Sequence, residues 1–217
     1  MPDFHLEKEF QHTQFVFGID EAGRGPWCGP VVAACVCWPD FNIPDELATQ
    51  IDDSKKLSAT KREDLFQSIM QSNALIGIGI ASSDEIDDKN ILQATFLAMH
   101  RSLEQVSKNQ QITPSAVLID GNRLPKDWDI PAKAIIKGDH LSLSIASASI
   151  VAKVTRDRLM KELAKSHPEY GWDKNAGYGT KEHILAIEKY GITPIHRRSY
   201  APIKRYLENK SILQKKA

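Results

Sequence analysis

Four acidic residues stand at or just after the ends of apolar segments: Asp20, Glu21, Asp120 and Asp139. Carboxylates held close together repel one another, and their pKa values rise unless cations offset the charge. Hard oxygen ligands of this kind favour Mg²⁺ or Mn²⁺, and two such ions can activate a water and stabilise the leaving oxygen of a phosphoryl transfer. If the four side chains converge, they predict metal-dependent hydrolysis of a phosphodiester.

Their spacing leaves another interpretation open, because an aspartate after a strand is also ordinary turn chemistry. Successive side chains on a strand face opposite ways. Asp20 and Glu21 can therefore enter one site only if the chain turns there, and we expect Ala22 and Gly23 to make that turn.

The elements that must position these carboxylates follow from the pattern of apolar residues. Segments rich in β-branched or alternating apolar residues predict strands at 15–20, 31–38, 74–81, 115–120 and 132–137, the first two pairing as neighbours. Helical periodicity and polarity predict helices at 59–71, 90–106, 141–165, 180–190 and 201–213. This order indicates an α/β fold with a mixed sheet covered by helices. Residues 144–152 are mostly Ala and Ser, so that helix can approach the sheet closely.

Composition limits the class of protein. With 41% hydrophobic residues in 217, the chain can fill a core, and its longest apolar run, 31–38, is too short to span a bilayer. The acidic N-terminus resembles no targeting peptide, and Cys35 and Cys37 fit small buried hydrophobes, so we expect a cytoplasmic protein. The net charge is zero, but residues 175–217 hold nine Lys or Arg against three Asp or Glu, a distribution that suits either phosphate binding or a solvated basic helix.

Several longer motifs occur in a fixed order along the chain. They are GIDEAGRGPWCGPVVAA at 18–34, DSKKLS at 53–58, LIDGN at 118–122, KGDH at 137–140, ASASIVAKVTRD at 146–157, GYGT at 177–180 and HRRSY at 196–200. Together they resemble ribonuclease HII, the bacterial type 2 ribonuclease H, over roughly residues 15–202.

The resemblance implies a ribonuclease H-like fold with a mixed five-stranded sheet flanked by helices. It divides the chain into a catalytic domain at 1–170 and a small, basic, mainly helical region at 171–217 that contributes to substrate binding. It also implies cleavage of the RNA strand of RNA·DNA hybrids and incision 5′ to single ribonucleotides in duplex DNA, leaving 3′-hydroxyl and 5′-phosphate ends. The expected role is ribonucleotide excision and RNA primer removal by a monomeric enzyme that uses two Mg²⁺ or Mn²⁺ ions.

The same resemblance carries site residues onto this sequence. The metal-binding, catalytic carboxylates are Asp20, Glu21, Asp120 and Asp139. Gly23, Arg24 and Gly25 resemble the loop that senses the ribose 2′-hydroxyl, the group that separates RNA from DNA. Tyr178 is similar to the tyrosine that stacks on the sugar beside the scissile bond. The residues expected to hold backbone phosphates are Lys55, Lys56, Arg197 and Arg198.

Some residues depart from the family pattern or receive no site role. Trp27 and Cys28 replace a more usual Leu-Ala pair, which raises the question of whether a reactive thiol lies near the site. Asp157 fits a structural role or one that supports the metal ligands without touching the metal, and neither His183 nor His196 is assigned to the site. The C-terminal 211–217 lacks the paired aromatics of a clamp-binding tail, so no clamp partner is expected, and no membrane partner either.

Two rival functions remain open from the sequence. A metal-dependent exonuclease or strand-transfer nuclease on the same scaffold would also use carboxylates at strand ends, although the adjacent Asp20 and Glu21 followed by Gly-Arg-Gly disfavour it. A non-catalytic nucleic-acid-binding relative would keep the groove without the chemistry, and the presence of all four carboxylates disfavours that reading.

Overall fold

A mixed five-stranded sheet with strand order β3-β2-β1-β4-β5 forms the centre of the computed structural model. The structure describes residues 1–10, 15–51, 57–126 and 128–214, with side chains as far as 211. The strands are β1 (Val16–Ala22), β2 (Val31–Cys37), β3 (Leu75–Ala81), β4 (Ala116–Asp120) and β5 (Ala132–Ile135). β1 pairs antiparallel with β2 and parallel with β4. All five predicted strands and the predicted pairing of the first two are confirmed.

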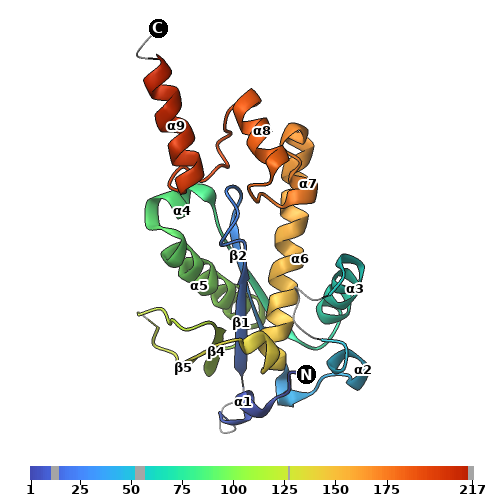
Figure 1. Ribbon diagram of the computed structural model, residues 1–217. Helices are drawn as coiled ribbons and strands as arrows, with labels where there is room; N and C mark the ends of the chain where they lie inside the picture. Colours follow the sequence, from blue (N-terminus) through green and yellow to red (C-terminus); the bar gives the residue numbers. More distant parts are fainter. Residues whose placement is uncertain (11–14, 52–56, 127, 215–217) are drawn as a thin grey trace.

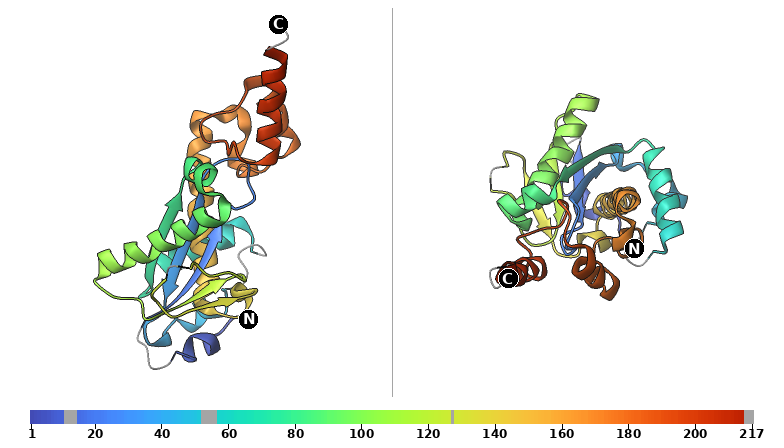
Figure 2. Two further views of the ribbon diagram at one scale, coloured as in Figure 1. Left: turned by 90° about the vertical axis from the view of Figure 1, so that its left-hand side faces the viewer. Right: turned by 90° about the horizontal axis from the view of Figure 1, so that it is seen from above.

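Two long helices cover opposite faces of this sheet. Helix α6 (Leu143–Ser166) lies on one face and α5 (Ile91–Gln110) on the other, as the view from above in Figure 2 shows. The remaining α-helices are α1 (His5–Lys8), α2 (Asp45–Ala48), α3 (Ala59–Met70), α4 (Ser83–Lys89), α7 (Trp172–Asn175), α8 (Lys181–Tyr190) and α9 (Ala201–Gln214). Short 3₁₀ turns occupy η1 (Pro39–Phe41), η2 (Gly138–His140) and η3 (Pro168–Tyr170).

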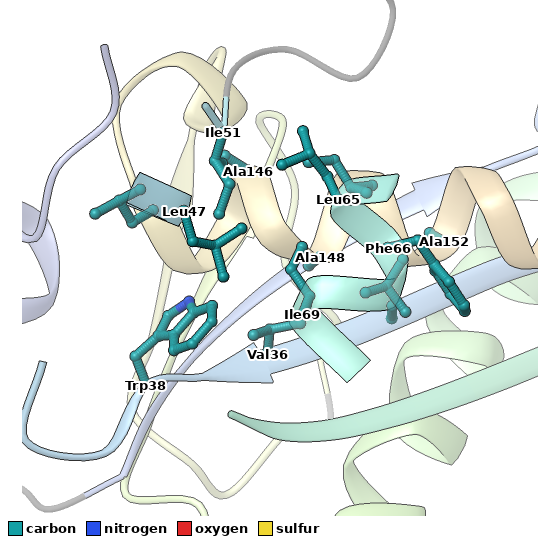
Figure 3. Close-up of a cluster of buried hydrophobic side chains, with 14 of the residues drawn as sticks. Val36, Trp38, Leu47, Ile51, Leu65, Phe66, Ile69, Ala146, Ala148 and Ala152 are labelled. Carbon is teal, nitrogen blue, oxygen red and sulfur yellow. The ribbon is translucent and has the colours of Figure 1, made fainter. Parts of the chain in front are cut away.

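Alternate residues of β2 pack into separate cores on the two faces of the sheet. Ala34 and Val36 belong to the cluster beneath α3 and α6, which Figure 3 shows around Trp38 and Ile69. Cys35 belongs to the cluster beneath α5. Because both faces are covered, β2 is buried at every position, which explains why its sequence is apolar throughout instead of alternating.

The small residues of α6 let its backbone touch the sheet, as the sequence predicted. A Cβ built on Gly18 of β1 would lie 2.2 Å from the backbone nitrogen of Ile145. The indole nitrogen of Trp38, the residue after β2, donates to the hydroxyl of Ser147 at 3.1 Å. This close contact fixes α6, and the residues that it carries, relative to the end of β1.

The chain after α6 gathers at the end of the molecule opposite the N-terminus (Figure 1). A further core cluster joins Cys28 and Met160 to Tyr170, Trp172 and Ile203, so this region packs on the far end of α6 and on the loop after β1. None of the helices in the described ranges has the length and apolarity needed to cross a bilayer.

Candidate active site

Asp20 and Asp120 follow the last residue pair that joins the neighbouring parallel strands β1 and β4. Ile19 pairs with Ile119, which brings the two aspartates side by side at the same edge of the sheet. Asp20 is 4% exposed, and one of its oxygens accepts from the Glu21 amide at 2.7 Å. Burial, followed by the charges of Glu21 and Asp120, raises the pKa of Asp20 well above its usual value, and a hydrogen bond with Ser149 partly opposes this.

Asp139 reaches the same edge through the turn that precedes α6. The amide of Gly138 donates to Oδ1 of Asp120 at 2.7 Å, which ties the η2 turn to the end of β4. Asp139 is the next residue and is 5% exposed, with the nearer imidazole nitrogen of His140 at 4.0 Å. Three strongly separated parts of the chain thus meet where β1 and β4 end.

Glu21 leaves the strand toward the opposite face from Asp20. The expected turn comes too late to prevent this, because β1 stays paired with β2 through Ala22 and the chain first departs at Gly23, whose φ is +100°. The Glu21 carboxylate accepts from Arg24 at 3.2 Å and lines a cleft of about 70 Å³ together with Asp120. Glu21 still acts on Asp20 through its charge, which helps to raise the pKa of Asp20.

The residues at this edge have the donor atoms that a hard divalent cation prefers, although their side chains are not grouped around one point. Among the described residues, no three His, Cys, Asp or Glu side chains are grouped closely enough to hold a metal ion. The donors are nevertheless all carboxylate oxygens, the type that Mg²⁺ and Mn²⁺ prefer. Burial and the neighbouring acids raise the pKa of Asp20, so its ionised form is disfavoured unless a cation offsets the charge.

A second cleft, of about 420 Å³, begins beside Glu21 and contains the predicted sugar-sensing residues. Gly23, Arg24, Gly25 and Tyr178 all line it. Tyr178 is 50% exposed, and a Cβ built on Gly25 would lie 3.4 Å from its ring, so the glycine loop and the tyrosine face one another. Their approach brings residues 153 positions apart in the chain to one cleft next to the carboxylates.

Proteins of known family share both the sequence and the fold of this chain. The family model described as Ribonuclease HII matches residues 17–203. The chain belongs to the ribonuclease HII family. It is 49% identical over 207 residues to Ribonuclease HII of Paramagnetospirillum magneticum, covering 95% of this chain and 99% of the relative. It is 50% identical over 208 residues to Ribonuclease HII of Anaplasma phagocytophilum, covering 94% and 95%.

A solved structure supports the same assignment. The fold is similar to the crystal structure of ribonuclease H2 from Pyrococcus horikoshii, with a TM-score of 0.71 and 27% identity over 90% of this chain and 98% of that one. The predicted ribonuclease H-like fold is thereby confirmed, and the chain is a ribonuclease of the H type.

Of the basic residues that the family resemblance suggested, Arg197 lies in an unexpected environment. Its side chain is 0% exposed, and its guanidinium donates to backbone carbonyls of the 23–30 loop instead of facing solvent. The prediction that Arg197 contacts backbone phosphates is therefore wrong for this structure, because buried donors already occupied by carbonyls cannot reach a phosphate. Arg198 is exposed, and its amide donates to Asp87 at 2.7 Å. Lys55 and Lys56 lie outside the described residues.

Ser149 and Arg156 join the site although the sequence analysis gave neither a role. Ser149 hydrogen-bonds Asp20, and both Ser149 and Arg156 line the cleft of the glycine loop. Arg156 is 1% exposed and donates to the carbonyls of Pro30, Ala176 and Cys28 at 3.0, 3.0 and 3.2 Å. Both lie within the 146–157 motif, so that motif is the feature of the sequence that could have identified them as site residues. The structural role expected for Asp157 agrees with its bond from Lys153 at 2.7 Å.

Cys28 is not the reactive thiol that its position near the site suggested. It is fully buried, and desolvation raises the pKa of its thiol to about 12. Its carbonyl accepts from Arg156, so the residue packs the loop in place. Cys35 and Cys37 are buried as the sequence predicted.

Proposed function

We propose that this chain is a divalent-metal-dependent endonuclease that hydrolyses the RNA strand of RNA·DNA hybrids and cuts on the 5′ side of single ribonucleotides in duplex DNA. The products would carry 3′-hydroxyl and 5′-phosphate ends. The observation that carries the proposal is the meeting of Asp20, Asp120 and Asp139 at one sheet edge, beside the cleft that holds Gly23 and Tyr178. Membership of the ribonuclease HII family supports the same activity.

The carboxylates would hold Mg²⁺ or Mn²⁺, which when bound lowers the pKa of a water and offsets charge on the phosphate. Asp20 is positioned by the Glu21 amide and Ser149, and Asp120 by the Gly138 amide. The glycine loop and Tyr178 would select the nucleotide by its 2′-hydroxyl and sugar.

Metal binding can be measured without activity. Because a cation offsets the charge of a buried carboxylate, Mg²⁺ or Mn²⁺ should stabilise the folded protein and raise its midpoint temperature of thermal unfolding. At an ion concentration about one hundredfold above Kd, the free energy of unfolding should increase by about 3 kcal/mol. Asp20→Asn should reduce this rise, since it removes the buried charge. A midpoint that does not move with either ion would contradict the metal role of these carboxylates.

Cleavage is tested with a DNA duplex that has blocked ends and one internal ribonucleotide, with and without chelator. We expect a single internal cut 5′ to the ribonucleotide, its loss with chelator, and no cut in the all-DNA duplex. Asp139→Asn should abolish cleavage and leave duplex binding largely intact. Digestion only from unblocked ends would favour an exonuclease, and chelator-independent binding without turnover would favour a binding module.

A further inference from the structure

The guanidinium of Arg197 is enclosed by carbonyl oxygens of the loop that follows β1. Nη2 donates to Gly23 at 2.6 Å, Nη1 donates to Arg24 at 3.1 Å and Pro26 at 2.8 Å, and Nε donates to Gly29 at 3.0 Å. These partners lie more than 160 positions away in the sequence. One side chain from the C-terminal region therefore organises almost the whole glycine loop.

No carboxylate of the described residues forms an ion pair with this buried cation, although the charge of Asp87 attracts it. Within the described ranges, the ion pairs include no acid that contacts the guanidinium of Arg197 or of Arg156. Burial lowers the pKa of Arg197, but an arginine in a protein stays protonated. The dipoles of the loop carbonyls therefore stabilise the charge, and the charge in turn fixes the direction in which each carbonyl points.

This direction determines where the loop amides point. Every peptide bond described is trans, so the N–H of each peptide points opposite to its C=O. With the carbonyls of Gly23 and Arg24 directed onto Arg197, the amides of Arg24 and Gly25 point away from it. The next amides are already used, because Trp27 donates to Gly177 at 2.8 Å and Gly29 donates to Ile195 at 2.9 Å.

The amides of Arg24 and Gly25, by contrast, donate to no acceptor in the described part of the chain. Both residues line the 420 Å³ cleft with Tyr178. A cation on the carbonyl side of a peptide also polarises its N–H, which strengthens the bond that the amide can donate. The loop thus has two strengthened donors at residues that line the cleft.

We propose that Arg197 is a positioning residue for ribonucleotide recognition, because it holds the loop so that the Arg24 and Gly25 amides donate to the 2′-hydroxyl oxygen of the ribose. The inference rests on the proposed function. Tyr200 assists, since its hydroxyl accepts from Arg197 at 2.9 Å and donates to the Arg24 carbonyl. Arg156 acts on the neighbouring carbonyls of Cys28 and Ala176, which joins the loop to the segment that carries Tyr178.

The test compares Arg197→Lys and Tyr200→Phe in an Asp139→Asn background, which prevents turnover. Lysine keeps the charge but lacks the planar fork that engages several carbonyls at once. We expect the Asp139→Asn protein that keeps Arg197 to bind a duplex with one ribonucleotide more tightly than the same duplex made of DNA alone. Arg197→Lys should reduce that preference about tenfold and Tyr200→Phe about threefold, with all-DNA affinity changed less than about twofold.

Arg101→Lys is the matched control, because Arg101 also donates to a backbone carbonyl, that of Ile80, and pairs with Glu85 instead of with the 23–30 loop. It should leave the preference unchanged. Thermal unfolding of each variant reports whether it folds, and Tyr200→Phe decides the question if Arg197→Lys does not fold.

The outcomes separate this inference from the function on which it rests. The positioning role is overturned if Arg197→Lys folds and keeps the full preference for the duplex with one ribonucleotide. If Arg197→Lys does not fold, an unchanged preference in Tyr200→Phe overturns it. An equal loss of affinity for both duplexes also overturns it, because that pattern indicates a sequence-independent phosphate contact. If the protein with Arg197 intact shows no preference at all, the proposed function fails, and this inference fails with it.

Discussion

Acid should destabilise this protein through His196, whose ring is 1% exposed and surrounded by groups that favour its neutral form. Its Nδ1 accepts from the Thr193 amide at 3.0 Å, so a proton there would break that bond. Its Nε2 lies 3.2 Å from Nε2 of His183. Burial, and then the nearby His183, lower the pKa of His196 from 6.5 to about 4.

The sign and size of the effect follow from this pKa. Between pH 6.5 and about 4 the unfolded chain binds a proton that the folded protein does not, so the stability contributed by neutral His196 is complete above 6.5 and falls as pH falls. At about 1.4 kcal/mol per pKa unit, the loss approaches about 3 kcal/mol below pH 4 and is about 2 kcal/mol between about pH 7 and about pH 5.

The assay is urea unfolding at these two pH values for wild type, His196→Gln and a control, His5→Gln. Glutamine can still accept from the Thr193 amide but does not titrate, and the side chain of His5 is 54% exposed. No histidine is among the groups that shift the pKa of Asp20, so the titration of Asp20 is common to all three proteins. The loss of unfolding free energy on acidification should be about 2 kcal/mol smaller in His196→Gln than in wild type, and unchanged in His5→Gln. An equal loss in wild type and His196→Gln would refute the reasoning.

Three further predictions test packing and access. Gly18→Ala should destabilise the fold by about 3 kcal/mol or more in chemical denaturation, because its Cβ would lie 2.2 Å from the Ile145 backbone; a loss below about 1 kcal/mol would mean that α6 shifts easily. Cys28 should resist a thiol reagent in the native protein and react in denaturant, and fast native labelling would contradict its burial. Glu85→Gln should cost about 1 kcal/mol in urea unfolding, since it weakens both the Ser82 capping box and the pair with Arg101; no change would show that the α4 cap is dispensable.

Much of the fold was predictable because its signals are local. The dense apolar segments of β1 and β2 and the Ala and Ser face of α6 each specify an element through residues that are neighbours in the chain. Helix α4 was missed, although Ser82 and Glu85 form a capping box three residues apart, because its seven residues are too few for a clear apolar period. The division of the chain near Tyr170 and the lack of a clamp-binding tail stay predictions.

The sequence predicted which acids lie at the candidate site better than it predicted how their side chains are directed. Asp20, Asp120 and Asp139 were selected as acids at the ends of apolar segments, and the structure brings them to one edge. Their roles as metal ligands stay predictions. The direction of Glu21 was not predictable, because it depends on how far β1 remains paired with β2, which is decided by a partner strand and not by the residues that follow Glu21.

The sequence by itself determined the family, the order of the strands and of the longer helices, and the acids at the ends of apolar segments, since these depend on residue type and on short-range pattern. Only the tertiary structure decided that Arg197 is enclosed by the 23–30 loop instead of facing solvent, and that Cys28 is buried. Both outcomes depend on burial, and burial is set by groups remote in the chain. A guanidinium that looks free in the sequence becomes a buried donor once the loop at 23–30 folds around it.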